Sequence, residues 1–292
     1  MTTKAFKSIL IYGRKPAKII RDNIKMVTDL LTELNIDWFI EPETANIHQL
    51  ASKPQNDTAE DLVIVIGGDG SILQAAQYAT KKSLAILGIG YGRVGFLTDH
   101  YDLNQPTFRQ ILLGDYSTES RLMFDLWYKH HDQIKPIGTC VNEVCLSRQP
   151  QQHMLETELY VDNKPICHFH GDGIIVSTPS GSTAYALSAG GPIVCPDIDA
   201  MIIVPICPHK LSSRPIIVSA TSQIELQISH FHQQSANLAF DTQMPLSIEK
   251  HQRLMVKASK QRLTLIHPPQ HSFYETLKTK LSWEHRFHAE HH

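Results

Sequence analysis

A glycine-rich turn that contains one acid is the part of the sequence best suited to chemistry. The aliphatic run Leu62 to Ile66 leads directly into Gly67-Gly68-Asp69-Gly70. Glycines let the backbone take positive φ and come close to a ligand, and Ser71 is a typical N-cap for the apolar-periodic segment that follows. A strand, a glycine turn and a helix N-terminus direct several N–H groups at one point, which suits a phosphate chain.

An acid in such a turn would repel phosphate unless it has another task. Holding a metal ion and taking a proton from a hydroxyl nucleophile are the two tasks that fit Asp69. The alternative is an ordinary turn between a strand and a helix, in which Asp69 only caps its own backbone.

A second group of small polar residues and glycines lies between residues 171 and 192. Ser182 and Thr183 at a helix start offer hydroxyls and N–H groups to a nucleotide or phosphate. Asp172, between two glycines at the head of a strand, is suited to accept hydrogen bonds from ribose hydroxyls or an adenine amino group. Tyr185 offers a ring for stacking. The Gly-x-Ser-x-Gly pattern of a serine hydrolase is absent from this stretch, because the second glycine is missing.

The surrounding elements predict an α/β N-terminal domain with a parallel sheet and a mostly-β C-terminal domain. Strand patterns alternate with helical segments through the first third of the chain, which is typical of a helix-covered parallel sheet. Ligands bind such sheets beyond the carboxyl ends of the strands. From about Ser117, short strands separated by turns follow. We expect domains at residues 1–116 and 117–267, with a C-terminal helical segment at 268–292 that returns to the first domain.

The stretch Gly90-Tyr-Gly92-Arg-Val-Gly95 satisfies the G-x-G-x-x-G pattern of dinucleotide-binding folds. That fingerprint also needs a helix that opens at the glycines, and the following residues do not have helical spacing until about Gln105. The sequence therefore disfavours a dehydrogenase of the Rossmann type.

Composition excludes several classes of partner. The chain of 292 residues is 42% hydrophobic and 19% charged, with a formal net charge of −2. No basic field indicates nucleic acid or an anionic membrane surface, and no apolar run approaches the roughly 18–20 residues that span a bilayer. The N-terminal residues lack a signal-peptide layout. These features predict a cytoplasmic protein that binds neither nucleic acid nor membrane.

The cysteines and histidines do not predict a metal centre. The five cysteines include no Cys-x-x-Cys pair and are interpreted as reduced thiols. The 17 histidines, among them His168-Phe-His170, lack the spacing of a zinc site. We interpret most of them as surface residues and assign no residue as a metal ligand.

The order of the motifs resembles bacterial NAD kinase, of the ATP-NAD kinase family, over nearly the whole chain. Gly-Gly-Asp-Gly alone is shared with lipid kinases and phosphofructokinases, whereas the long Thr178-Pro-Ser-Gly-Ser-Thr-Ala-Tyr185 element is far more restrictive. Further matches are Asn142-Glu143, Gly171-Asp172-Gly173, Gly95-Phe-Leu-Thr-Asp99, Gly190-Gly-Pro192, Pro205-Ile-Cys-Pro-His209 and Arg214-Pro215.

The resemblance implies ATP-dependent phosphorylation of the 2′-hydroxyl of the adenosine ribose of NAD, with Asp69 as the general base. It also implies a divalent metal cation, Mg²⁺ first of all, with ATP and NAD as substrates, and assembly as a homodimer or homotetramer. The nucleotide-binding residues that it implies are Gly67, Gly68, Gly70, Asn142, Glu143, His153, His170, Asp172, Thr183, Ala184, Tyr185, Ala186, Leu187, Ser188 and Gln243.

The chain departs from the family pattern at three places. Gly90 stands where the family has Asn, and the β-branched Thr242 stands where the family has Gly, which readily adopts positive φ. His153 and His170 replace Arg or Lys, which would make charge contacts there pH-dependent. Two rival functions remain: a lipid kinase, which should show a membrane-facing surface, and a module that binds NADP without turnover.

Overall fold

The chain folds into two compact units. The computed structural model describes residues 5–51, 60–91, 95–100, 106–131, 133–149, 153–229, 235–250 and 252–283. The first unit combines Met1–Glu119 with Thr264–His292, and the second unit is Ser120–Leu263. Within the described residues, no helix is long and apolar enough to cross a membrane.

A seven-stranded sheet forms the centre of the first unit. Its strands are β1 (Ser8–Tyr12), β2 (Asp37–Ile40), β3 (Leu62–Ile66), β4 (Ala85–Gly90), β5 (Asp99–His100), β6 (Ser117–Arg121) and β19 (Leu263–His267). Their order is β2-β1-β3-β4-β19-β6, and β5 pairs with β4. The pairs of β1 with β2 and β3, and of β4 with β3, β5 and β19, are parallel. Every residue of β1 and β3 is buried, as expected for strands covered on both faces.

Helices α1 (Lys18–Glu33), α2 (Pro42–His48), α3 (Asp69–Lys81), α4 (Pro106–Leu112) and α6 (Phe273–Leu281) belong to the same unit. Helix α1 buries Ile20, Ile24, Val27 and Leu31, whose spacing places them on one helical face against the sheet. Helix α6 lies against the segment after β4, where the rings of Phe273 and Phe96 are 6.4 Å apart.

Helix α3 starts earlier than the sequence predicts. Its N-cap is Gly68, and Asp69 is already in its first turn. The N–H of Ser71 donates to the carbonyl of Gly68 at 2.8 Å, so Ser71 lies inside the helix and is not the N-cap. The correction matters because it puts the acid of the glycine turn at the helix N-terminus.

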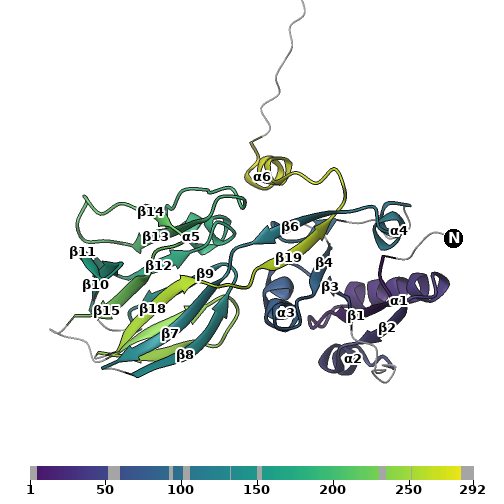
Figure 1. Ribbon diagram of the computed structural model, residues 1–292, viewed down its shortest axis with the longest axis horizontal. Coiled ribbons are helices and arrows are strands. Elements are labelled where there is room, and N and C mark those ends of the chain that lie inside the picture. The colour runs from purple at the N-terminus through teal and green to yellow at the C-terminus, as the bar shows by residue number, and fades with distance from the viewer. Residues whose placement is uncertain are drawn as a thin grey trace, which may run out of the picture. The chain divides into compact units, whose positions relative to one another are not determined.

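Strand β19 reaches the first sheet after the chain has passed through the whole second unit, and it lies between β4 and β6 (Figure 1). The sequence assigns residues 264–267 to the second domain because they follow a run of short strands. Their hydrogen-bonded neighbours place them in the first unit, so the boundary falls between Leu263 and Thr264.

Two six-stranded sheets build the second unit. The first has the order β11-β10-β15-β18-β7-β8 and the second β14-β13-β12-β9-β16-β17, with antiparallel pairing throughout. The first contains β7 (Phe124–His130), β8 (Gln133–Cys140), β10 (Leu155–Val161), β11 (Lys164–Gly171), β15 (Ile224–Ile228) and β18 (Arg253–Ala258). The second contains β9 (Glu143–Ser147), β12 (Gly173–Ser177), β13 (Ala200–Ile206), β14 (Ile216–Ser219), β16 (Ser235–Phe240) and β17 (Leu246–Glu249).

One apolar cluster takes side chains from both of these sheets, for example Leu126 of β7 and Leu146 of β9, so the sheets pack face to face. The helix that the sequence predicts to start at Ser182 or Thr183 is two short pieces, a 3₁₀ turn at Gly181–Thr183 and α5 at Tyr185–Ser188. Ala184 between them has φ −104° and ψ −127°, which interrupts the helix. The predicted fold class, α/β followed by mostly β with a returning C-terminal helix, is confirmed.

Candidate functional site

The carboxylate of Asp69 is held by the segment that follows β4. Oδ2 accepts the N–H of Phe96 at 2.8 Å, and Oδ1 accepts the N–H of Leu97 at 3.0 Å. The hydroxyl of Thr98 adds a longer contact to Oδ1 at 3.4 Å. Asp69 therefore caps a distant segment of chain and not its own turn. Because a carboxylate has about four lone-pair positions, two backbone donors leave it able to accept a further proton or hydrogen bond.

Gly95 provides the space for this arrangement. A Cβ atom built on Gly95 would lie 1.9 Å from Oδ1 of Asp69 and 2.3 Å from the hydroxyl oxygen of Thr98. Any larger residue would collide with the carboxylate. The last glycine of the G-x-G-x-x-G pattern therefore leaves room for the Asp69 carboxylate.

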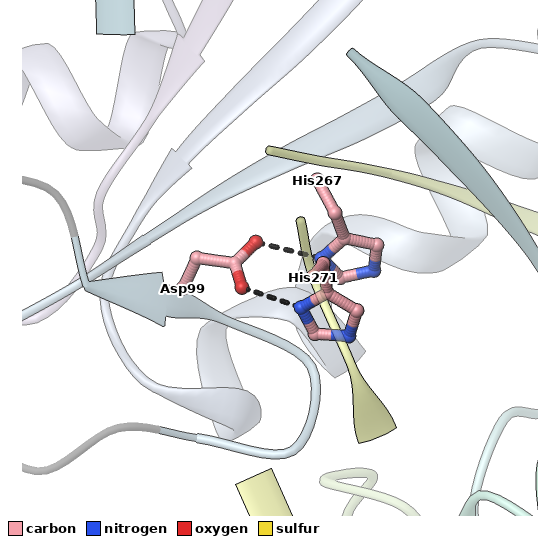
Figure 2. Close-up of side chains that lie close together, drawn as sticks. All are labelled: Asp99, His267 and His271. Atoms are coloured by element: carbon pink, nitrogen blue, oxygen red, sulfur yellow. Dashed lines mark hydrogen bonds and ion pairs between the residues drawn. The ribbon is translucent and has the colours of Figure 1, made fainter. Parts of the chain in front are cut away.

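A cluster of three ionisable side chains follows directly along the chain. Asp99 accepts hydrogen bonds from Nδ1 of His267 at 2.6 Å and Nδ1 of His271 at 2.9 Å (Figure 2). On the other side of the His267 ring, Nε2 lies 3.2 Å from a carboxylate oxygen of Glu119. His267 is 2% exposed, so these carboxylates surround a buried imidazole.

The Asp99 carboxylate and the His267 imidazole stabilise each other's charged forms. Burial works to raise the pKa of Asp99, but hydrogen bonds from His267 and His271 outweigh it and lower that pKa to about 2. Burial alone would lower the pKa of His267, yet the two carboxylates beside it raise the pKa above its usual value. The cluster fixes the end of β19 and the turn before α6 to β5, next to the segment that holds Asp69.

In the second unit, Asn142 and Glu143 are fixed by Asp241. The Asp241 carboxylate accepts the N–H of Val141 at 2.7 Å and that of Asn142 at 2.9 Å, and the N–H of Asp241 donates to the Glu143 carbonyl at 3.3 Å. Oδ1 of Asn142 and Oε2 of Glu143 are buried and have no hydrogen-bond partner among the described residues. Buried polar atoms without partners are rare, because leaving one unsatisfied costs about 1–3 kcal/mol. Two on adjacent residues are typical of a place where a ligand binds.

The side-chain pKa of Glu143 is strongly shifted. Its pKa is raised to about 8, first by burial and then by the negative charge of Asp241, although a hydrogen bond from the Tyr185 backbone opposes the shift. Asp241 itself has a pKa raised to about 6 by burial. Glu143 is thus largely protonated at neutral pH and offers both a donor and an acceptor.

Asp172 pairs with Arg148, a residue that sequence reasoning missed. Nε of Arg148 lies 2.7 Å from Oδ1 of Asp172, and the backbone N–H of Arg148 donates to the Asp172 carbonyl at 2.9 Å. The two side chains are 37% and 40% exposed. The pair is accessible to a ligand, and Arg148 sets the orientation of the carboxylate.

The hydroxyls of the Thr-Pro-Ser-Gly-Ser-Thr element mostly hold the loop in place. Oγ1 of Thr178 donates to the Val141 carbonyl at 2.6 Å, and the buried hydroxyl of Ser182 donates to the Pro179 carbonyl at 2.6 Å. A Cβ atom on Gly181 would come within 2.3 Å of the Asn142 carbonyl. The element is therefore packed directly against the segment that carries Asn142 and Glu143.

The remaining predicted residues differ in what they can offer. Tyr185 is 45% exposed, whereas Ala186 is fully buried in an apolar cluster with Ile175 and Val204, so only its backbone can reach a ligand. His153, Ser188 and Gln243 are exposed, and Thr183, Ala184, Leu187 and His170 are half-buried. Positive φ falls on Asp241 (45°) and not on Thr242, so the β-branched Thr242 is tolerated.

The glycine turn with its fixed carboxylate is suited to bind phosphate, and the unsatisfied polar groups of the second unit are suited to bind a nucleotide. Comparison with known proteins identifies the family of the chain. Family models for the ATP-NAD kinase N-terminal and C-terminal domains match residues 20–114 and 141–268. The chain belongs to the ATP-NAD kinase family, whose bacterial members catalyse the ATP-dependent phosphorylation of NAD to NADP.

Curated relatives agree over almost the full length. The NAD kinase of Coxiella burnetii is 37% identical over 287 residues, covering 97% of this chain and 96% of that one. The NAD kinase of Marinobacter nauticus is 39% identical over 285 residues, covering 95% and 97%. Solved structures share the fold at low identity. They include yeast NADH kinase complexed with NADH (TM-score 0.81, 21% identical, covering 98% and 90%) and an Archaeoglobus fulgidus NAD kinase in complex with ATP (TM-score 0.71, 22% identical, covering 96% and 100%).

Proposed function

We propose that the phosphoryl group is transferred to the 2′-hydroxyl of the adenosine ribose of NAD, and that Asp69 accepts the proton of that hydroxyl. The position of Asp69 supports this proposal most directly. It follows a buried strand, lies in the first turn of α3 beside backbone N–H groups suited to phosphate, and has both oxygens fixed by backbone donors. A fixed carboxylate needs little rearrangement to take a proton from a well-placed hydroxyl.

Gly67, Gly68 and Gly70 would allow the phosphates to approach the backbone of this turn. Among the described residues, no other atom lies within 4 Å of a Cβ built on Gly68 or on Gly70, so their outer faces are open. The reaction needs charge neutralisation on the transferring phosphoryl group, which N–H groups and a divalent cation supply.

We further propose that this cation, Mg²⁺ first of all, arrives with ATP as part of the substrate. Both oxygens of Asp69 accept backbone N–H groups, and we assign the remaining acceptor capacity of this carboxylate to the proton of the ribose hydroxyl. Mg²⁺ commonly keeps several waters and binds mainly through substrate phosphates. We therefore assign it no protein ligand.

For NAD recognition we propose Asn142, Glu143 and Asp172 as hydrogen-bonding residues. The unpartnered Oδ1 of Asn142 and Oε2 of Glu143 support the first two. A protonated Glu143 can both donate and accept, which suits the edge of a nucleotide base. The remaining contacts proposed are the ring of Tyr185, the backbone of residues 183–188, and the side chains of His153, His170 and Gln243.

We propose self-association through the edges of the second unit. Each of its four edge strands carries an exposed large aliphatic residue: Ile134 on β8, Ile166 on β11, Ile217 on β14 and Leu246 on β17. Exposed edges with apolar side chains favour pairing with another chain. Light scattering should show a homodimer or homotetramer, in a protein that we expect in the cytoplasm, and a monomer at micromolar concentration would contradict this.

An Asp69→Asn variant tests the catalytic role. Removing a general base typically costs about 10²–10⁴ in rate, so kcat per folded molecule should fall by that factor while calorimetry shows NAD affinity within a few-fold of the parent. NMR of the parental product should place the new phosphate ester on the 2′-oxygen of the adenosine ribose.

Asp61 supplies a matched control, because its carboxylate also accepts two successive backbone N–H groups, those of Lys7 at 2.7 Å and Ser8 at 3.3 Å. Asp61→Asn and Asp69→Asn should both lower stability, by about 1–3 kcal/mol, and only Asp69→Asn should lose turnover. Equal kcat values for the two folded variants would remove Asp69 from the mechanism.

A further inference from the structure

Two histidines and a glutamate converge on the surface of the second unit. Strands β10 and β11 pair antiparallel, with Glu156 opposite His170 and Glu158 opposite His168. Residues two apart on a strand share one face, and directly opposed residues on neighbouring strands share it as well. Glu156, His168 and His170 therefore lie on one face of the sheet.

Their ligand atoms are spaced for an ion between them. Nδ1 of His170 is 3.6 Å from Oε1 of Glu156, and Nε2 of His168 is 3.9 Å from Oε2 of the same carboxylate. All three ligand atoms lie within 4.8 Å of one another. These separations exceed the hydrogen-bonding range. Zn–N and Zn–O bonds of about 2.0–2.2 Å at a tetrahedral angle separate two ligand atoms by roughly 3.4 Å, so small side-chain movements complete the geometry.

The cluster of Asp99, His267 and His271 provides an internal contrast. There the nitrogens touch the carboxylate at 2.6 and 2.9 Å, and the imidazole rings are stacked with an interplanar angle of 17°. Two nearly parallel rings cannot direct their lone pairs at one ion, and the short contacts leave no space for it. The rings of His168 and His170 instead lie at 72°, which allows their lone pairs to converge.

We propose that Glu156, His168 and His170 bind a transition-metal ion of the Zn²⁺ type, with three protein ligands and an open position for water. Imidazole and carboxylate are suitable ligands for such an ion. The side chains of His168, His170 and Glu156 are 44%, 35% and 24% exposed, so an ion can reach them from solvent.

Ser229 adds a hydroxyl beside the proposed site. Its Oγ donates to Oε2 of Glu156 at 3.1 Å and lies 2.8 Å from Nε2 of His168. Binding of the ion replaces the contact between His168 and Ser229, while the hydrogen bond from Ser229 to Glu156 remains and orients the carboxylate. Such outer contacts fix the ligands of metal sites.

We expect the bound ion to weaken the binding of NAD. This inference rests on the proposed contact between His170 and NAD. An ion held by His170 occupies a residue assigned to nucleotide binding. Zn²⁺ should then raise the KM for NAD in the parent protein. A Glu156→Gln/His168→Asn variant, which leaves His170 in place, should not respond in this way.

Calorimetric titration of the full chain with Zn²⁺ alone tests the site independently of activity. The parent should bind one Zn²⁺ that Glu156→Gln/His168→Asn binds at least tenfold more weakly or not at all. His130→Asn/His131→Asn is the matched control, because it removes two exposed histidines that are adjacent in sequence and whose rings are 4.4 Å apart. This control variant should still bind the ion.

Identical titrations for the parent and Glu156→Gln/His168→Asn would overturn the site. Retained Zn²⁺ binding with an unchanged KM for NAD would support the site and overturn only its coupling to His170. The proposed role of Asp69 as general base is tested separately, because the Asp69→Asn variant is assayed without Zn²⁺. A negative result for Asp69 therefore leaves both conclusions about the ion unaffected.

Discussion

Nδ1 of His267 lies 2.6 Å from Oδ2 of Asp99, although 168 residues separate the two in the chain. The contact fixes the end of β19 to β5, next to the three residues that hold the Asp69 carboxylate. Asp99 directly follows Thr98, so the C-terminal part of the chain supports the segment that orients the proposed base.

This cluster should make stability depend on pH. Because the pKa of His267 is raised in the folded protein, its contribution to the free energy of unfolding is fully present below the unfolded pKa of about 6.5. That contribution is lost as pH rises through the higher folded pKa. The lowered pKa of Asp99 means that its contribution is present above about 3.8 and is lost as pH falls toward about 2. Among the described residues, the titratable groups that face His267 are Asp99, Glu119 and His271.

His267→Asn should therefore lower the free energy of unfolding by about 3 kcal/mol near pH 6, because breaking a buried ion pair leaves an uncompensated charge. The difference from the parent should shrink as pH rises above the folded pKa of His267. Urea denaturation at several pH values measures both effects, and a difference that grows with pH would contradict the charged state assigned to His267.

Gly95→Ala should damage both stability and turnover. The added Cβ would lie 1.9 Å from Oδ1 of Asp69, so the carboxylate or the segment must move. Overpacking typically costs about 1–3 kcal/mol, and kcat should fall because the proposed base is displaced. Gly70→Ala is the control for stability, since its Cβ meets no atom of the described part of the chain within 4 Å and it lies inside α3. Equal thermal stability of the two variants would disprove the collision.

Glu143→Gln should change the pH dependence of the ligand-free protein. The folded pKa of Glu143 is about 8, so its stabilising contribution is complete below the unfolded value of about 4.3 and is lost as pH rises through about 8. Because one pKa unit corresponds to 1.36 kcal/mol, the parent should lose at least about 1 kcal/mol more than Glu143→Gln between pH 5 and pH 8.5. Parallel stability curves would show that Glu143 titrates normally.

Asp172→Ala should raise the KM for NAD roughly tenfold and leave kcat within a few-fold. The variant removes an acceptor proposed for the ligand, and an unsatisfied polar group costs about 1–3 kcal/mol. Arg148→Ala is the comparison, because it removes the partner of Asp172 and keeps the carboxylate. If the Arg148→Ala variant raises KM more than Asp172→Ala does, the arginine and not the aspartate is the main contact.

Local patterns were enough to find the residues whose role depends on neighbours in sequence. The glycine turn around Asp69 could be recognised because a buried strand and an apolar-periodic helix flank it. Asn142 and Glu143 were found only through the family resemblance, and the sequence could not show that Asp241 fixes them.

Other residues depend on pairings that the sequence does not display. Glu156 meets His168 and His170 only because of the register between β10 and β11. His267 meets Asp99 only because β19 returns to the first sheet. The helix start at Asp69 was misplaced to Ser71 because serine is a common N-cap, whereas the backbone of Gly68 takes that position here.

The position of β19 has a consequence for synthesis of the chain on the ribosome. Its neighbours β4 and β6 are made early, but the strand that joins them is made only after the whole second unit. The second unit is continuous in sequence and can complete its core first, while the part of the β4 edge that pairs with β19, at Ile86 and Leu87, is still unpaired and open to aggregation. Nascent chains that stop before Leu263 should therefore contain a folded second unit and an N-terminal part that chaperones still bind.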